Sequence, residues 1–134
     1  MEMKMFLQKL ISWCCEQGKE YEEIINNDDF FVMSVIITID GQKKKIIVRN
    51  IGESIFIGCD VCKINRHKLN SAVNICAEMN ENNLVTCSIK RNENGVILEI
   101  MRFVSLKSLD MSILVIQEIE EKIRKYYDKI KTLC

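Results

Sequence analysis

The 134-residue sequence predicts an α+β fold in which five antiparallel strands form one sheet packed by three helices. Three observations lead to this prediction. Apolar residues recur at three- and four-residue spacing in three segments, as in amphipathic helices. Runs rich in β-branched residues lie between these segments. The dipeptides Asp40-Gly41 and Asn94-Gly95 interrupt such runs, and they accept the positive φ angles of tight hairpin turns.

The first predicted helix runs from about Met3 to Gln17. Its apolar stripe consists of Met3, Leu7, Leu10, Ile11 and Cys14. Gly18 is expected to end the helix because glycine accepts positive φ at a helix C-terminus. Residues 19–29 are acidic, and two interpretations stay open for them: an extension of the helix or a loop.

Three strands are predicted next. Residues 31–39 and 43–49 should pair antiparallel around Asp40-Gly41. A turn over residues 50–53 leads to a third strand at residues 54–61, giving the order α-β-β-β for this half of the chain.

The second half predicts the order α-β-β-α. A helix from about Arg66 to Glu81 has the apolar stripe Leu69, Ala72, Val73, Cys76 and Met79. Asparagines end it, since Asn tolerates the left-handed conformation, and these are Asn80, Asn82 and Asn83. Strands at residues 84–90 and 96–104 follow, joined by Asn94-Gly95. The last helix begins near Ser108 or Asp110 and extends to about Thr132.

Composition bounds the class of protein. The length suits a single domain, residues 1–134. Apolar residues make up 48% and charged residues 28%, the balance of a globular protein, and the formal net charge is zero. This neutrality argues against general binding of nucleic acid. No apolar run reaches the roughly 18 residues of a membrane span, and no secretory signal is apparent at the N-terminus. We expect a cytoplasmic protein that binds neither membrane nor nucleic acid.

Two of the predicted strands are apolar on both faces. Residues 31–39 carry only Ser34 and Thr38 as polar exceptions, and residues 96–104 carry Glu99 and Arg102. Helices packed on one side of the sheet cannot bury all of this surface, and a leftover apolar surface usually marks an interface. The simplest arrangement is a two-fold homodimer. The alternative is that the surplus covers a thicker core.

The seven cysteines include one suggestive pair. Cys59-Asp60-Val61-Cys62 with His67 has the C-x2-C-x4-H spacing that opens a zinc knuckle, but Ala72 stands where the fourth ligand belongs, and Cys76 follows four residues later. A redox C-x-x-C would place the first cysteine at a helix N-terminus, whereas Cys59 ends a strand. A metal- or redox-linked protein using Cys59 and Cys62 is therefore the alternative function, and packed strand-end thiols are the simpler interpretation.

The remaining candidate motifs do not match the patterns of known catalytic or phosphate-binding sites. His67 has no recognisable nucleophile, and a solvated position at the start of a helix is expected for it. Gly52 and Gly58 lack the spacing of a phosphate loop. Lys43-Lys44-Lys45 is expected to keep a strand edge soluble, and Trp13 is expected to pack at a helix margin. We therefore predict no catalytic residue, no cofactor-binding residue and no metal ligand.

The C-terminal half resembles the YbjN family of bacterial sensory transduction regulators. The residues that carry the resemblance are LNSAVNICAEMNENNLVTCSIKRNENGVILEIMRF, followed by the helix DMSILVIQEIEEKIRKYYDKI. The family's helix with a "VN…N" pattern corresponds to Val73-Asn74 and Asn80. The resemblance implies the order α-β-β-β-α-β-β-α, which is also that of type III secretion chaperones, small dimers that bind extended protein segments. It transfers no catalytic residue.

Together these observations predict a non-enzymatic protein-binding module, chaperone-like or regulatory. We expect a homodimer that docks a protein or peptide partner through an apolar sheet face or an exposed strand edge.

Overall fold

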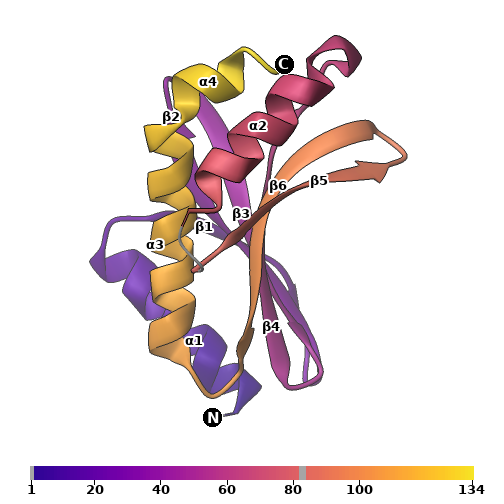
Figure 1. The fold of residues 1–134 in the computed structure, drawn as a ribbon. Coiled ribbons are helices and arrows are strands. Elements are labelled where there is room, and N and C mark those ends of the chain that lie inside the picture. Colours follow the sequence, from indigo (N-terminus) through magenta and orange to yellow (C-terminus); the bar gives the residue numbers. More distant parts are fainter. Residues whose placement is uncertain (1, 82–83) are drawn as a thin grey trace.

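The computed structural model describes residues 2–81 and 84–134 (Figure 1). The helices are α1 (Met3–Glu16), α2 (Leu69–Met79), α3 (Leu109–Lys125) and α4 (Tyr127–Lys131). The strands are β1 (Glu20–Asn26), β2 (Phe31–Ile39), β3 (Gln42–Ile51), β4 (Ser54–Lys63), β5 (Thr86–Asn92) and β6 (Gly95–Ser105). The predicted α+β class is confirmed. Figure 1 shows the helices gathered on one side of a twisted sheet.

The sheet has six strands in the order β1-β2-β3-β4-β6-β5, and every neighbouring pair is antiparallel. The prediction of five strands was wrong because residues 20–26 form β1, where a helix extension or a loop was expected. This segment lacks the alternation of a half-buried strand, since all its residues except Tyr21 are exposed. Its strand conformation therefore depends on pairing with β2, which its own sequence does not show.

The predicted turns follow from residues that accept positive φ. Asp40 and Gly41 have φ angles of 52° and 77°, the primed conformation that suits a two-residue hairpin. Gly18, at φ 66°, follows the end of α1 as predicted. In the second hairpin the two turn residues are Glu93 and Asn94, and Gly95 begins β6 with a φ of 113°. The predicted turn was therefore placed one residue too late.

The core lies between the sheet and the helices. Alternate residues of the central strands point toward the helices and are buried, among them Met33, Val35, Ile46, Val48, Ile57 and Ile100. The helices contribute Phe6, Leu10, Met79, Ile116, Ile119 and Ile123. Helix α3 packs on β4 and β6, α2 packs on β5, and α1 packs against α3. One apolar cluster thus joins both halves of the chain.

The predicted helix boundaries need two corrections. A 3-10 turn, Arg66–Lys68, precedes α2, whose first α-helical residue is Leu69. The long C-terminal helix is interrupted at Tyr126, which has φ −102° and ends α3 before α4 begins. Asn80 follows the last residue of α2, as expected, while the predicted stop residues Asn82 and Asn83 lie outside the described residues.

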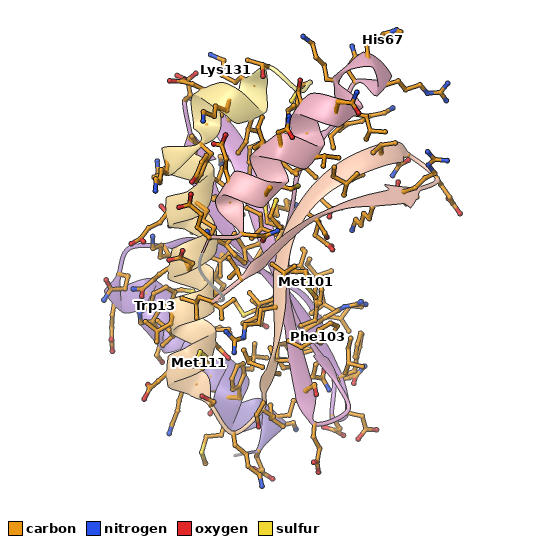
Figure 2. The ribbon with its side chains drawn as sticks, in the orientation of Figure 1. Trp13, His67, Met101, Phe103, Met111 and Lys131 are labelled. Atoms are coloured by element: carbon orange, nitrogen blue, oxygen red, sulfur yellow. The ribbon has the colours of Figure 1, made fainter. Side chains whose placement is uncertain are left out.

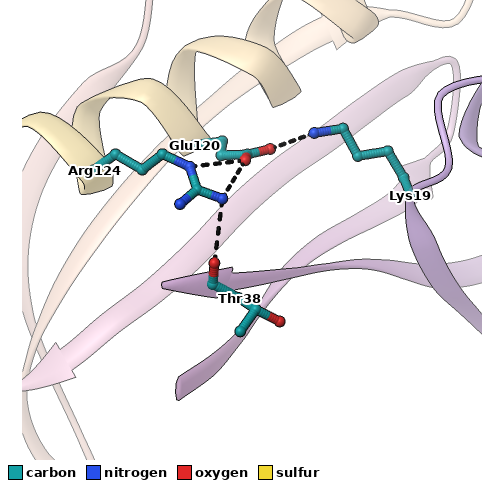
Figure 3. Close-up of polar contacts among 4 residues, drawn as sticks. All are labelled: Lys19, Thr38, Glu120 and Arg124. Atoms are coloured by element: carbon teal, nitrogen blue, oxygen red, sulfur yellow. Dashed lines mark hydrogen bonds and ion pairs between the residues drawn. The ribbon is translucent and has the colours of Figure 1, made fainter. Parts of the chain in front are cut away.

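A charged cluster fastens α3 to the start of the sheet (Figure 3). The Glu120 carboxylate lies 2.6 Å from Lys19 Nζ and accepts two hydrogen bonds from the Arg124 guanidinium, at 3.0 and 2.7 Å. Arg124 also donates to the backbone oxygen of Thr38, at 3.2 Å. Partial burial works to raise the pKa of Glu120, but the bonds from Lys19 and Arg124 lower it overall.

Candidate functional site

The face of the sheet turned away from the helices is the main candidate site, and we call it the open face. Its centre is formed by outward-pointing residues of four strands, namely Val32, Ile47, Phe56, Gly58, Met101 and Phe103. Figure 2 shows Met101 and Phe103 on the side of β6 away from α3, whereas Trp13 lies among the helices. Phe103 is 52% exposed, unusual for a large aromatic side chain in a folded protein.

The strand register arranges the open face in rows that cross β3, β4 and β6. Arg49, Phe56 and Phe103 form one row. Ile47, Gly58 and Met101 form the next. Two residues further along each strand, Lys45, Asp60 and Glu99 form a charged row, since side chains of alternate residues share a face. An apolar centre is thus bounded on one side by charge.

The missing side chain of Gly58 shapes this centre. The Phe56 ring leans over Gly58 and meets the Phe103 ring edge-on, with centroids 5.3 Å apart. The Arg49 guanidinium carbon lies 5.2 Å from the centroid of the Phe56 ring, within the range of a cation–π contact. Beside these rings is a hollow of about 570 Å³ whose lining includes Val32, Ile47 and Gly58.

Charged residues around this centre form ion pairs along the sheet. Lys45 Nζ lies 2.8 Å from Glu22, and Lys43 Nζ lies 3.1 Å from Glu20. The hydrogen bond from Lys45 lowers the pKa of Glu22. Lys43 and Lys45 thus lie on a solvated surface. The expectation that the lysine run keeps a strand edge soluble was wrong, because β3 lies between β2 and β4 and has no free edge.

Lys90 joins the charged row from β5. Its Nζ lies 2.8 Å from both Asp60 and Glu99. Partial burial works to lower the pKa of Lys90, but the two carboxylates raise it overall. The positive and negative charges of the open face therefore largely offset one another.

The structure separates the two cysteines of the C-x-x-C motif. Cys59 is buried on the helix side of β4, and burial raises the pKa of its thiol to about 12. A register shift between Asp60 and Cys62 follows, and Cys62 is half-buried beside Cys134. Burial, followed by the hydrogen bond with Cys134, raises the pKa of Cys62 to about 12. The two thiols of the motif have different surroundings and different neighbours.

Another cysteine pair was not recognised from the sequence. Cys76 of α2 and Cys87 of β5 have their sulfur atoms 3.2 Å apart. The spacing of the two residues gives no motif, because a helix and a strand bring them together across a connecting segment. The sequence placed Cys76 on the apolar stripe of its helix, but it gave no signal that Cys87 would lie opposite.

The remaining candidates are scattered. His67 lies exposed in the 3-10 turn before α2, far from Phe103 in Figure 2. Trp13 packs against the edge of the core, as expected. Within residues 2–81 and 84–134, no group of three His, Cys, Asp or Glu side chains is arranged to hold a metal ion. In the same ranges, no helix is both apolar enough and long enough to cross a membrane.

A second hollow lies between the β5–β6 hairpin and the start of α2. It has a volume of about 700 Å³, and its charged lining residues are Lys63, Arg66, Arg91 and Glu93. Three of these four residues are cationic, so the hollow suits an anion. General acid–base catalysis would need an acid and a base placed near a reacting atom, and the lining does not supply such a pair. We therefore rank the open face ahead of this hollow.

Comparisons with known proteins add one finding. No protein-family model and no curated protein sequence matches the chain. The fold is similar to that of YbjN from E. coli, described as a proposed transcription regulator, with a TM-score of 0.59 and 16% sequence identity. The similarity covers 89% of this chain and 86% of YbjN. At this identity the comparison concerns the fold alone. The chain therefore has a YbjN-like fold, as the resemblance in its C-terminal half implied.

Proposed function

We propose that the chain is a non-enzymatic protein-binding module, regulatory or chaperone-like, whose open face packs against the open face of a second copy. The observation that carries this proposal is the exposed apolar centre around Phe103. Removal of an aromatic side chain from water is favourable by about 25 cal/mol per Å² of apolar surface that is buried. Leaving Phe103 exposed forgoes this stabilisation. A regulatory or binding role also agrees with the YbjN-like fold.

The rows of the open face suit a two-fold axis that runs along β4 and passes over Gly58. Such an axis places β3 of one copy opposite β6 of the other. Ile47 then faces Met101, and Arg49 faces the ring of Phe103. In the charged row, Lys45 faces Glu99. On the axis itself Asp60 faces Asp60 of the second copy, and Lys90, whose Nζ lies 2.8 Å from this carboxylate, offsets part of the repulsion. Away from the axis the surface is complementary to itself in both polarity and charge, as an isologous interface requires.

The strand edges suit this purpose less well than the face. The β1 edge carries a register shift between Glu23 and Ile25, and such bulges disfavour the addition of another strand. On the β5 edge, the Asn80 side chain already occupies the backbone N–H and C=O of Cys87. We therefore assign the docking surface to the face of the sheet.

An interface of standard size would cover only a small share of the surface of the chain. A standard interface buries about 800 Å² on each partner. The accessible surface of the described chain is 7699 Å², so roughly a tenth of it would be covered. Two sheets that pack face to face keep their strands within about 30° of each other, which leaves the central rows in contact.

A second candidate function is binding of single-stranded nucleic acid. Adjacent rings on a sheet, here half-buried Phe56 and exposed Phe103 beside Arg49, are the kind of surface on which bases stack. The YbjN structure is itself described as that of a proposed transcription regulator. Against this, Lys43 and Lys45 are already paired with carboxylates, which weakens any attraction to phosphate. We favour the homodimer for that reason.

Analytical ultracentrifugation over a range of concentrations tests the proposal. The wild-type chain should sediment with twice the mass of the 15.6 kDa chain. Phe103→Asp should give the mass of one chain, because it places a charge in the apolar centre. The matched control is Leu114→Asp on α3, since Leu114 is 49% exposed but lies on the helix side. That variant should remain dimeric.

Charge reversal tests the two-fold axis itself. Lys45→Glu alone and Glu99→Lys alone should each weaken the dimer, and the double variant should restore it. A wild-type chain that is monomeric at all concentrations would rule out the homodimer. If that monomer binds a labelled single-stranded oligonucleotide, and Phe103→Asp abolishes the binding, the nucleic-acid function replaces it.

A further inference from the structure

Two thiols from different elements lie side by side at the edge of the core. Cys76 is on α2 and Cys87 is on β5, 11 residues later, and their sulfur atoms are 3.2 Å apart. Both side chains are largely buried, with 8% of Cys76 and 3% of Cys87 exposed. Of the two, Cys76 is thus the more accessible to a small molecule.

The surrounding contacts hold the two sulfur atoms in this position. The Asn80 amide bonds to the backbone of Cys87, with the N–H of Cys87 donating at 2.7 Å and the C=O accepting at 2.8 Å. The sulfur of Met79 lies 3.9 Å from that of Cys87. Because α2 packs on β5, the thiols meet without any rearrangement of the backbone.

The pair differs electrostatically from the buried thiols elsewhere. Cys76 and Cys87 share a hydrogen bond between their sulfur atoms in which either thiol can be the donor. This bond lowers the pKa of Cys76, although burial opposes the effect. Buried Lys122 of α3, which donates to the backbone oxygen of Met79, adds a positive charge nearby. By contrast, burial raises the pKa of Cys14 to about 11 and that of Cys59 to about 12.

We propose that Cys76 and Cys87 form a site of reversible disulfide formation, with hydrogen peroxide or an organic hydroperoxide as the oxidant. Two sulfur atoms already in contact need only a small approach to reach bonding distance. The site is independent of the open face and of the function proposed for it.

The reaction balances with peroxide as the co-reactant. The Cys76 thiolate attacks one peroxide oxygen, the O–O bond breaks, and the products are a Cys76 sulfenic acid and hydroxide. The proton that Cys76 had released converts this hydroxide to water. The Cys87 sulfur then attacks the Cys76 sulfur, the S–O bond breaks, and the departing hydroxide takes the Cys87 proton. Two thiols and one hydrogen peroxide thus give one disulfide and two waters.

Peptide mapping of the wild-type chain tests the proposal. The reduced protein is exposed to limiting hydrogen peroxide without air, its remaining thiols are blocked under denaturing conditions, and it is digested without reductant. Trypsin leaves both cysteines on the peptide from Leu69 to Lys90, and a second cleavage after Glu78 and Glu81 separates them. We expect two peptides linked through Cys76 and Cys87, released by dithiothreitol, as the first disulfide formed.

Other oxidation products decide against the proposal. It is overturned if Cys62–Cys134 or an intermolecular disulfide through exposed Cys15 forms while Cys76 and Cys87 stay reduced. It is equally overturned if Cys76 is converted to sulfinic or sulfonic acid with no link to Cys87. Cys76→Ser and Cys87→Ser should each abolish the linked peptides, and Cys15→Ser should leave them unchanged. The wild-type map decides the question even where a serine variant does not fold.

Discussion

The Asn80 side chain makes two hydrogen bonds with the backbone of Cys87, at 2.7 and 2.8 Å. It therefore pairs with β5 as the backbone of an additional strand would, at an edge that is otherwise open. Asn80 directly follows the last residue of α2, so the contact also fixes how this helix meets the sheet. An asparagine predicted as a helix stop thus has a second role in tertiary structure.

Replacement of this asparagine should destabilise the fold. Asn80→Ala removes two hydrogen bonds worth about 1 kcal/mol each, so the free energy of unfolding should fall by about 2 kcal/mol. Urea denaturation followed by circular dichroism measures the change. Asn74→Ala is the matched control, because Asn74 is an exposed asparagine of the same helix. Equal losses in the two variants would show that the Asn80 contact contributes nothing specific.

The Glu120 cluster predicts a loss of stability in acid. The folded-state pKa of Glu120 lies below its ordinary value of 4.5, so its contribution is present above that value and is lost as the pH falls through the folded pKa. Because the group is partly solvated, we expect a contribution of about 1 kcal/mol. Glu120→Gln should lower the unfolding free energy at pH 7 and flatten its decline below pH 4.5. Glu121→Gln, at an exposed neighbouring position, should leave both unchanged.

The buried Cys59 thiol should cause a loss of stability at high pH, whereas the Glu120 carboxylate causes one at low pH. The folded-state pKa of Cys59 is about 12, against an ordinary value of 9.0, so the unfolded chain releases its proton first. Stability from this group is therefore complete below pH 9.0 and declines as the pH rises toward 12. At pH 10 the loss should be about 1.4 kcal/mol for this one group.

Comparison of unfolding free energies at pH 8 and pH 10 measures this effect. Cys59→Ala should reduce the difference in unfolding free energy between pH 8 and pH 10. The loss of packing from this substitution affects the free energy at both pH values and does not enter the difference. Exposed Cys15→Ala serves as the control and should keep the wild-type difference. An unaltered difference in Cys59→Ala would mean that the Cys59 thiol ionises equally well in both states.

Local chemistry explains which parts of the fold the sequence predicts. Asp40-Gly41 specifies its turn because both residues accept positive φ, and the stripes of α1 and α3 specify helices that bury one side. The strand β1 escapes prediction because its conformation comes from pairing with β2, a long-range cause. Surplus apolar residues correctly indicated exposed hydrophobic surface, since Phe103 is the most exposed aromatic side chain among those described in the strands.

Sequence spacing alone does not predict which cysteines come into contact. Cys59 and Cys62 attracted attention because two residues separate them, yet the register shift in β4 gives them different surroundings. Cys76 and Cys87 meet because α2 packs on β5, which no motif records. Contacts between separate elements depend on packing, and packing is not a local property of the sequence.

Gly58 provides a final test of the open face. A Cβ added at this position would lie 2.5 Å from Cζ of Phe56 and 3.1 Å from Cβ of Met101. Gly58→Ala should therefore push the Phe56 ring off its place, cost about 1 kcal/mol of stability through overcrowding, and weaken the proposed dimer. In a Phe56→Ala background the ring is absent, so the same substitution should cost much less. Urea denaturation of the four proteins in this double-mutant cycle measures the coupling between the two positions. Identical costs in both backgrounds would show that the Phe56 ring does not rest over Gly58 in solution, and the apolar centre would then have a different shape from the one on which the two-fold packing depends.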